Sequence, residues 1–225
     1  MKKENLIISV GGSLVCPDEI NTDFLREFRD LILKYIDRKR FFIYVGGGKT
    51  ARKYQAALSE FNASSDEKDW AGIWASRLNA YLVKNAFKDY CYPEIITDPT
   101  KKIKLKNNIL VAAGWKPGWS TDYDAVLLAK NFGLKKIINL TNIDYVYEKD
   151  PKKFPNAKPF EKISWEKFRK IVGFKWSPGL SMPFDPVAAK IAQKLKISII
   201  IINGKKLARL ENFLNNKPFI GTIII

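Results

Sequence analysis

The chain alternates short apolar runs, rich in β-branched residues, with longer stretches in which apolar residues recur every three or four positions. The short runs predict buried strands, and the longer stretches predict helices that bury one face. The predicted strands are Leu6–Val10, Phe41–Val45, Ile109–Ala113, Lys136–Leu140, Ile197–Ile202 and Ile220–Ile225. The predicted helices are Thr22–Tyr35, Thr50–Phe61, Ala71–Phe87, Asp122–Asn131, Trp165–Val172, Pro186–Leu195 and Leu207–Asn215. This order predicts an α/β fold with a largely parallel sheet between layers of helices.

The length and composition fit one compact domain or two closely joined lobes. The chain has 225 residues, of which 46% are hydrophobic and 28% are charged, values ordinary for a globular protein. The longest apolar runs are far shorter than the roughly 20 residues of a membrane-spanning helix. The two cysteines, Cys16 and Cys91, are too few for a disulfide framework, and no cleavage site follows the first residues. We therefore expect a cytoplasmic protein without a membrane span. The proline-containing segment Tyr145–Ser164 predicts an irregular excursion.

The charge of the chain is strongly positive, and histidine is absent. Lysine and arginine number 39 against 23 acidic residues, a net charge of +16. This excess keeps a nucleic-acid-binding function as an alternative. The basic residues are scattered in short groups, however, so we expect small phosphorylated ligands rather than nucleic acid. Because the sequence contains no histidine, every mechanism that needs a histidine base, nucleophile or metal ligand is excluded.

Two glycine clusters follow predicted strands directly. Gly11 and Gly12 follow the first strand, and Gly46–Gly48 lie between the second strand and a helix. Glycine in such turns allows backbone N–H groups to approach a phosphate closely, although each cluster alone also fits a tight turn. Neither has the spacing of a P-loop or a Rossmann fingerprint. Arg52 lies one helical turn after Gly48, where a guanidinium can bind two phosphate oxygens at once.

Two further polar turns follow the third and fourth predicted strands. Ser120, Thr121 and Asp122 offer hydroxyl and carboxylate groups at a helix start, where they can also act as caps. Thr141–Asp144 forms the other turn, in which Asp144 can orient Mg²⁺ or an amide, or simply cap the turn. Ligands of open α/β sheets bind at the carboxyl ends of the strands. The four polar turns therefore predict a ligand site at that edge.

The order of six segments resembles the archaeal UMP kinases of the amino acid kinase superfamily. They read GGS, VGGGKTARKY, DWAGIWASRLNAYLV, GWKPGWSTD, LTNIDYVYEKDP and FDPVAAKIA, and the match runs from Ile7 to Thr222. The resemblance implies a three-layer α/β/α sandwich forming one domain over residues 1–225. It implies a UMP-binding lobe over about residues 1–133 and an ATP-binding lobe over about residues 134–225. The implied reaction moves the γ-phosphoryl group of ATP to UMP, with Mg²⁺ as cofactor, in a homohexamer.

The resemblance also assigns site residues, and none of them is a metal ligand. The residues implied at the transferred phosphoryl group are Gly11, Gly12, Ser13 and Arg52. Those implied at ATP are Ser9, Val10, Gly48, Arg52, Thr141, Tyr147 and Asp150. Those implied around UMP are Gly47, Asp69, Lys116, Pro117, Gly118, Trp119, Ser120, Thr121 and Asp122. Asp69 rests on the resemblance alone, because an acid at that place otherwise looks like an ordinary residue of a helix start.

The chain departs from the family pattern at the first strand. Ser9 stands where many superfamily kinases carry a lysine. Positive charge at the transferred group must then come from Mg²⁺, Arg52, Lys49 and backbone amides. Tyr145 replaces the usual glycine of a D-G-V-Y turn.

Three alternatives remain open at this point. One is another kinase of the superfamily, of the isopentenyl phosphate, acetylglutamate or carbamate type. Isopentenyl phosphate kinases hold the substrate phosphate with a histidine, which this chain lacks. The second is a non-catalytic nucleotide-binding or storage assembly on the same fold, and the third is the nucleic-acid-binding protein. The aromatic residues Trp70, Trp74 and Tyr81 suit packing or a subunit contact better than stacking on a base.

Overall fold

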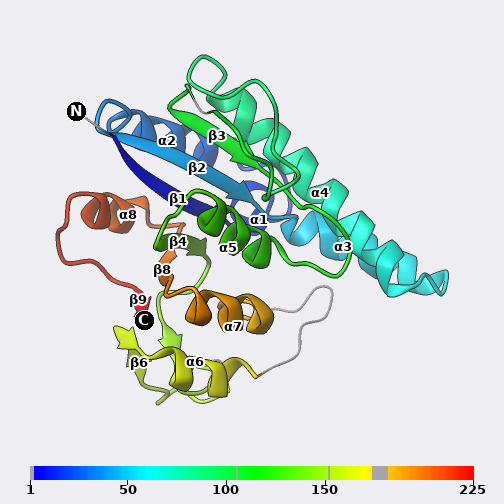
Figure 1. Cartoon of the computed structure of the whole chain (residues 1–225). Helices are drawn as coiled ribbons and strands as arrows, with labels where there is room; N and C mark the ends of the chain where they lie inside the picture. The colour runs from blue at the N-terminus through cyan, green and yellow to red at the C-terminus, as the bar shows by residue number, and fades with distance from the viewer. Residues whose placement is uncertain (1–2, 105, 152, 174–181) are drawn as a thin grey trace.

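A seven-stranded sheet forms the centre of the molecule (Figure 1). The computed structural model describes residues 3–104, 106–151, 153–173 and 182–225. The strands of the sheet are β1 (Glu4–Val10), β2 (Lys39–Val45), β3 (Ile109–Ala112), β4 (Lys136–Thr141), β7 (Lys162–Ile163), β8 (Ser198–Asn203) and β9 (Thr222–Ile224). Their order is β3-β2-β1-β4-β8-β9-β7, and the strands pair in parallel except for β8 with β9. This confirms the predicted largely parallel sheet.

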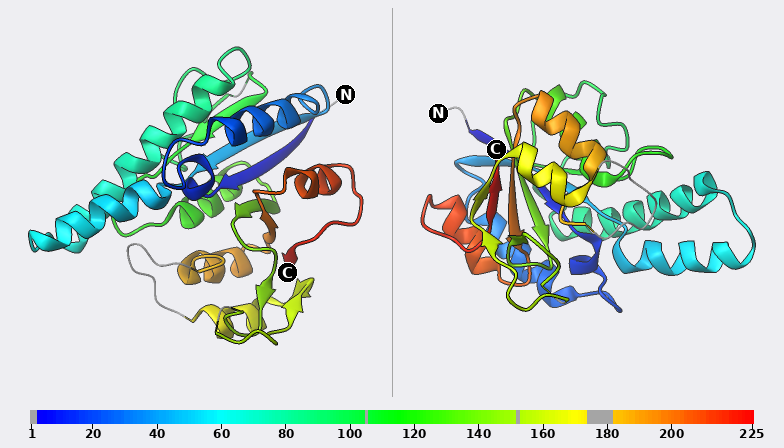
Figure 2. Two further views of the ribbon diagram at one scale, coloured as in Figure 1. Left: turned by 180° about the vertical axis from the view of Figure 1, so that it is seen from behind. Right: turned by 90° about the horizontal axis from the view of Figure 1, so that it is seen from below.

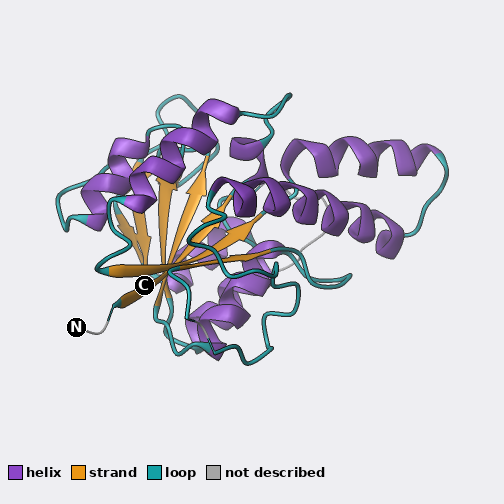
Figure 3. Ribbon diagram, turned by 90° about the horizontal axis from the view of Figure 1, so that it is seen from above, coloured by secondary structure: helices purple, strands orange, loops and turns teal. Residues whose placement is uncertain are grey.

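Helices cover both faces of the sheet, as Figure 3 shows from above. One face is covered by α1 (Gly12–Val15), α2 (Thr22–Leu33), α4 (Ser65–Ala86) and α8 (Leu207–Leu214). The other face is covered by α5 (Thr121–Asn131), α6 (Trp165–Val172) and α7 (Pro186–Lys194). Successive strand residues point to opposite faces, so Leu6 and Ile8 of β1 join the first core while Ile7 joins the second. The predicted three-layer α/β/α sandwich is confirmed.

Helices α3 (Gly48–Glu60) and α4 form a hairpin that projects beyond the sheet (Figures 1 and 2). The predicted start of the second of these helices, at Ala71, is wrong, because α4 begins at Ser65. Ser64 and Glu67 form a capping box there, in which each side chain pairs with the other residue's backbone N–H. The first turn is polar and exposed, so the apolar pattern that predicted the helix appears only later.

Two local predictions differ from the structure. The excursion predicted at Tyr145–Ser164 contains an antiparallel pair of short strands, β5 (Val146–Tyr147) and β6 (Pro159–Phe160), and also β7. The four-residue helix α1 was not predicted, since four residues are too few to show a helical period. Among the described helices, none has both the length and the apolar character needed to cross a membrane.

The sheet reverses its winding direction at β1. This strand pairs with β2 on one side and with β4 on the other, in parallel in both cases. The carboxyl ends of these three strands and of β3 therefore meet at one edge. In doubly wound α/β sheets, ligands bind in the crevice outside such a reversal. Every polar turn singled out in the sequence lies at this edge.

Candidate functional site

The two glycine turns touch at the carboxyl ends of β1 and β2. A Cβ atom on Gly12 would lie 2.3 Å from the carbonyl oxygen of Gly46 and 2.4 Å from the nitrogen of Gly48. A Cβ atom on Gly48 would lie 2.2 Å from the carbonyl carbon of Gly12, and Gly48 has a φ of +61°. Only glycine fits at both places without displacing backbone. The two turns thus form one continuous backbone surface.

A cleft lies beside this surface, between α3, α4 and the segment that leads into α5. Its volume is about 180 Å³. The cleft brings together these predicted site residues: Gly47, Gly48, Arg52, Asp69, Trp119, Ser120 and Thr121. It also contains Gly114, the first residue of the segment GWKPGWSTD, and residues that the sequence did not single out: Ala51, Gln55, Gly72, Ile73 and Ser76. Arg52 is exposed, so its guanidinium is free to reach a ligand in the cleft.

Side chains of α4 fix the backbone around the cleft. The hydroxyl of Ser76, only 1% exposed, donates to the carbonyl oxygen of Val45 at 2.8 Å and accepts from the N–H of Gly114 at 2.8 Å. The amide of Asn79 donates to the carbonyl oxygen of Gly46 at 2.9 Å. These bonds tie the carboxyl ends of β2 and β3 to one helix, so the walls of the cleft are built on a rigid element.

Asp69 connects α4 with the segment that precedes α5. Its carboxylate accepts a hydrogen bond from the N–H of Gly118 at 2.7 Å. Burial raises the pKa of this carboxyl above its usual value, and the bond from Gly118 opposes the rise. An acid next to the cleft and tied to its wall is well placed to accept a hydrogen bond from a ligand hydroxyl.

A cluster of polar side chains joins the starts of α5 and α7. Ser120 caps α5 by accepting from the N–H of Tyr123 at 3.1 Å, and its hydroxyl donates to Asp185. The N–H of Asp185 in turn donates to the carboxylate of Asp122 at 3.0 Å. Burial, and then the neighbouring Asp185 carboxylate, raises the pKa of Asp122 to about 7. Asp185 also caps α7 by accepting from the N–H of Ala188 at 3.1 Å.

A larger pocket, of about 690 Å³, lies at the carboxyl end of β4. Three predicted residues line it together: Thr141, Tyr147 and Asp150. The volume lies within the range of small-molecule sites, about 300–1,000 Å³. The walls also include two lysines of α6, Lys167 and Lys170. Lys149 lines the pocket as well, beside the acids Glu148 and Asp150. The lysines thus leave a small excess of positive charge, which suits an anionic ligand such as a polyphosphate.

The remaining predicted residues lie around these two cavities. Ser9 and Val10 are buried in β1, at 4% and 0% exposure, below the glycine turns. Ser13 lines a third cavity, of about 400 Å³, with Gly204 and Lys205. Lys116 is exposed and holds its ammonium 4.2 Å from the ring centre of Trp115. Pro117, Gly118 and Asp122 belong to the segment around the cleft, outside the residues that line it.

Asp144 has a structural role in this arrangement. Its carboxylate accepts from the guanidinium of Arg209 at 2.7 Å and from the amide of Asn203 at 2.6 Å. These bonds, that of Arg209 above all, lower the pKa of Asp144 to about 2. The carboxylate thus ties the turn after β4 to α8, which favours a structural anchor over the catalytic alternative.

The sequence model of the amino acid kinase family matches residues 5–203. The chain belongs to the amino acid kinase family. Within this family it is similar to the uridylate kinase of Pyrococcus abyssi, at 38% identity over 216 residues, 94% of this chain and 96% of that protein. The uridylate kinase of Methanospirillum hungatei is 33% identical over 97% of this chain and 94% of its own length.

Solved structures agree with the assignment to the amino acid kinase family. The crystal structure of uridylate kinase from Archaeoglobus fulgidus superimposes with a TM-score of 0.81 at 31% identity, covering 98% of this chain and 99% of that one. The structure of UMP kinase from Ureaplasma parvum has the same TM-score at 21% identity, covering 100% of this chain and 99% of its own. At that identity the second comparison shows the fold alone.

Several residues of this amino acid kinase site were missed in the sequence for a physical reason. Ser76 and Asn79 bind backbone atoms on other elements, and no local pattern reveals such partners. Lys167 and Lys170 lie on an amphipathic helix, where lysines normally face solvent. Gly72 was the one missed residue with a sequence signal, because glycine inside a helix often marks a place where a neighbouring element packs closely against the backbone.

Proposed function

We propose that this amino acid kinase is a UMP kinase, which transfers the γ-phosphoryl group of ATP to UMP and gives UDP. The observation that carries the proposal is a pair of touching glycine turns, with the cleft beside them and the larger pocket at the carboxyl end of the neighbouring strand β4. A phosphoryl transfer needs donor and acceptor sites that meet at such a backbone surface. The relatives are similar to this chain over nearly their whole length, and their names support UMP as the acceptor.

In this proposal UMP occupies the cleft and ATP occupies the larger pocket. UMP binds Gly47, Asp69 and the segment from Lys116 to Asp122, with Asp69 accepting from the ribose. ATP binds Thr141, Tyr147 and Asp150 and reaches Ser9, Val10 and Gly48 with its phosphates. The cleft is lined by residues between Gly47 and Thr121, and the larger pocket by residues between Thr141 and Pro183. This supports an acceptor lobe over about residues 1–133 and a donor lobe over about residues 134–225.

The chemistry requires alignment and positive charge rather than a base. The attacking oxygen of UMP is already anionic, so no proton has to be removed. Gly12 and Ser13 hold the transferred group through backbone N–H groups, and Arg52 neutralises its charge. Lys49 is the weaker candidate for this charge, because its ammonium already pairs with Asp18. Gly11 shapes the turn, because its own N–H donates to the carbonyl oxygen of Leu140 at 2.9 Å.

Mg²⁺ is proposed as the cofactor that accompanies ATP. Protein-bound Mg²⁺ usually keeps several waters and is held by one or two carboxylates plus substrate phosphates. Substrate phosphates and water would supply most of its ligands in this proposal, in keeping with a resemblance that assigns no residue of the chain as a metal ligand. Mg²⁺ would neutralise charge on the phosphates during transfer.

The protein is further proposed to act in the cytoplasm as a homohexamer, with no nucleic-acid partner. Both cysteines are free, as suits a reducing compartment. A set of exposed aromatic residues on α4, Trp70, Trp74 and Tyr81, supports self-association, because large exposed apolar patches commonly mark interfaces. Within the chain, Trp70 and Trp74 stack on each other and contact Arg77, but large parts of their side chains stay exposed.

The acceptor is tested by a coupled assay of MgATP with UMP, CMP, isopentenyl phosphate and N-acetylglutamate. We expect UMP to give the highest kcat/KM, because the similar relatives are uridylate kinases. A preference for isopentenyl phosphate or N-acetylglutamate would assign the chain to another activity of the family. Nucleotide binding without turnover of any acceptor would support the storage assembly instead.

A further inference from the structure

The segment that follows β3 begins with two residues whose backbone is held by side chains. We call residues 114–118 the acceptor turn, because Gly114 lines the cleft proposed for UMP. The N–H of Gly114 donates to the hydroxyl of Ser76 at 2.8 Å, and the N–H of Trp115 donates to the carboxyl group of Asp124 at 3.1 Å. The side chains that accept these bonds are buried, at 1% and 0% exposure. Both N–H groups are therefore occupied within the protein.

Arg77 holds the two carbonyl groups of the same residues. Its Nε donates to the carbonyl oxygen of Gly114 at 3.2 Å, and its Nη2 donates to that of Trp115 at 3.0 Å. Arginine presents its N–H groups in a rigid planar fork, which suits two acceptors at once. With Ser76 and Asp124, this guanidinium binds every backbone N–H and C=O of the two residues. The start of the acceptor turn thus depends on side chains for its conformation.

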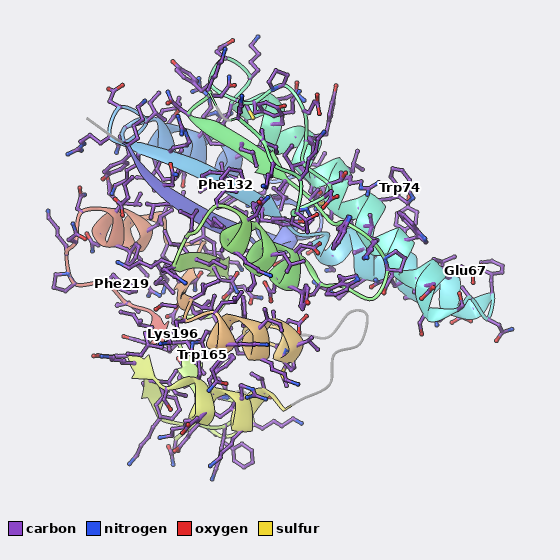
Figure 4. All side chains as sticks on the ribbon, viewed as in Figure 1. Glu67, Trp74, Phe132, Trp165, Lys196 and Phe219 are labelled. Carbon is purple, nitrogen blue, oxygen red and sulfur yellow. The ribbon has the colours of Figure 1, made fainter. Side chains whose placement is uncertain are left out.

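Two tryptophan rings of α4 orient the same guanidinium. Its carbon lies 4.9 Å from the ring centre of Trp74 and 5.9 Å from that of Trp70. The two rings stack on each other, and Trp74 lies on the outer side of the projecting hairpin (Figure 4). A guanidinium over an aromatic face is attracted by the ring. Because Arg77 must satisfy both the rings and the carbonyl groups, few orientations remain open to it.

The acceptor turn is fixed to α4 at its other end as well. The N–H of Gly118 donates to Asp69 at 2.7 Å. Asp69 and Ser76 lie about two helical turns apart, so they face the same side of α4. Between them, the Cα atom of Ile73 would lie 3.3 Å from a Cβ atom added to Gly114. The helix therefore packs directly on the turn and determines the position of both of its ends.

The residues after the acceptor turn form part of the cleft wall. Trp119, Ser120 and Thr121 follow Gly118 directly in the chain, and all three line the cleft. A shift of the turn would move them with it. Arg77 is not among the described residues that line the cleft. Any effect of Arg77 on a ligand there must therefore pass through the backbone that it holds.

We propose that Arg77 is a positioning residue for the acceptor, which fixes the acceptor turn so that residues 119–121 meet UMP in the place required for transfer. The inference rests on the proposed function only in taking UMP as the ligand of the cleft. It goes beyond that function by assigning acceptor affinity to a side chain outside the cleft.

A positioning role predicts a loss that is specific for the acceptor. Without the guanidinium, two carbonyl groups lose their donor, and a hydrogen bond from a charged group contributes about ten- to a hundredfold to an equilibrium constant. The larger pocket, proposed for ATP, is lined by residues between Thr141 and Pro183 and shares none with the turn. ATP should therefore bind as before. A purely structural role would instead lower the melting temperature and the fraction of folded protein, and leave both affinities of the folded protein unchanged.

The test measures the Kd values for UMP and for ATP by isothermal titration calorimetry. Arg77→Lys keeps the charge but lacks the planar fork, so the Kd for UMP should rise about tenfold. Arg77→Met keeps a long unbranched side chain without any donor, and its Kd for UMP should rise about a hundredfold. In both variants the Kd for ATP should stay within about twofold of the parent value.

Arg40→Met is the matched control. Arg40 also donates to a backbone carbonyl, that of Asn107 at 3.0 Å, but it lies near the start of β2, at the edge of the sheet away from the cleft. This exchange should lower the melting temperature and leave both Kd values unchanged. A loss of UMP affinity as large in Arg40→Met as in Arg77→Met would overturn the inference, as would equal losses for UMP and ATP in Arg77→Met. Parent-like UMP binding by Arg77→Lys and Arg77→Met would also overturn it.

Hydrogen–deuterium exchange of the peptide that covers the acceptor turn decides the matter without a ligand. The N–H groups of Gly114 and Trp115 should exchange faster in both Arg77 variants than in the parent, and at the parent rate in Arg40→Met. Equal rates in all four proteins would overturn the inference. A parent that phosphorylates isopentenyl phosphate or N-acetylglutamate instead of UMP would overturn the proposed function alone, and the same order of affinities for that acceptor would then support the role of Arg77.

Discussion

Replacing Gly48 by alanine should lower the rate of UDP formation by about a hundredfold or more, because the two glycine turns can no longer touch. The new Cβ atom would lie 2.2 Å from the carbonyl carbon of Gly12 and 2.5 Å from the nitrogen of Ser13. Backbone has to move, and a misplacement of about 1 Å at a reacting centre can cost about 10² in rate. Steady-state kinetics with MgATP and UMP give the measurement.

Gly133→Ala is the matched control for this exchange. Gly133 also has a positive φ, +67°, but nothing lies within 4 Å of its added Cβ atom. The control therefore carries the same backbone strain, about 1 kcal/mol, without the collision. It should lose a little thermal stability and keep its kcat. Equal kinetics for the two variants would mean that the contact between the turns is not part of the transfer site.

Arg52→Ala should lower kcat by about 10²- to 10³-fold, the usual effect of removing one group that stabilises charge in a transition state. Arg52 lines the cleft beside Gly48, one helical turn into α3. Since Ser9 supplies no positive charge from β1, little else on the protein replaces this guanidinium. The KM values for UMP and ATP should change much less than kcat, because the charge develops mainly during transfer.

Lys53→Ala provides the comparison for Arg52. Lys53 is exposed on the same helix and lies outside the residues that line the cleft. The Lys53→Ala exchange should leave kcat unchanged. This result would show that the effect of Arg52→Ala comes from the position of the guanidinium and not from the loss of one positive charge. A kcat for Arg52→Ala that equals that of Lys53→Ala would remove Arg52 from the transfer step.

The strands and the ligand edge of this fold could be predicted from sequence because their signals are local. The run Phe41–Val45 and the glycines after it lie next to each other in the chain, and the structure confirms both as a strand and its turn. The contact between Gly12 and Gly48 could not be predicted, since it depends on the register between β1 and β2. Sequence separates these residues by more than thirty positions, while the parallel sheet brings them together.

Asp69, in the proposed UMP site, likewise could not be recognised from the local sequence. Its helix begins at Ser65, so Asp69 lies inside α4 rather than at its start, and it is only 8% exposed. The residue that gives it a structural role, Gly118, comes almost fifty positions later. A carboxyl group becomes recognisable as a site residue only when its distant partner is known, which is why the resemblance and not the pattern identified it.

The central claim is that UMP and ATP bind in separate cavities that meet at the glycine turns, and a bisubstrate ligand tests it most directly. Uridine and adenosine joined by a chain of phosphates would span both cavities in one molecule. Because the second site is then filled at a high effective concentration, about millimolar for short linkers, isothermal titration calorimetry should give one ligand per chain and an affinity at least about a hundredfold above that of UMP or ATP. An affinity no higher than that of ATP alone would contradict the account.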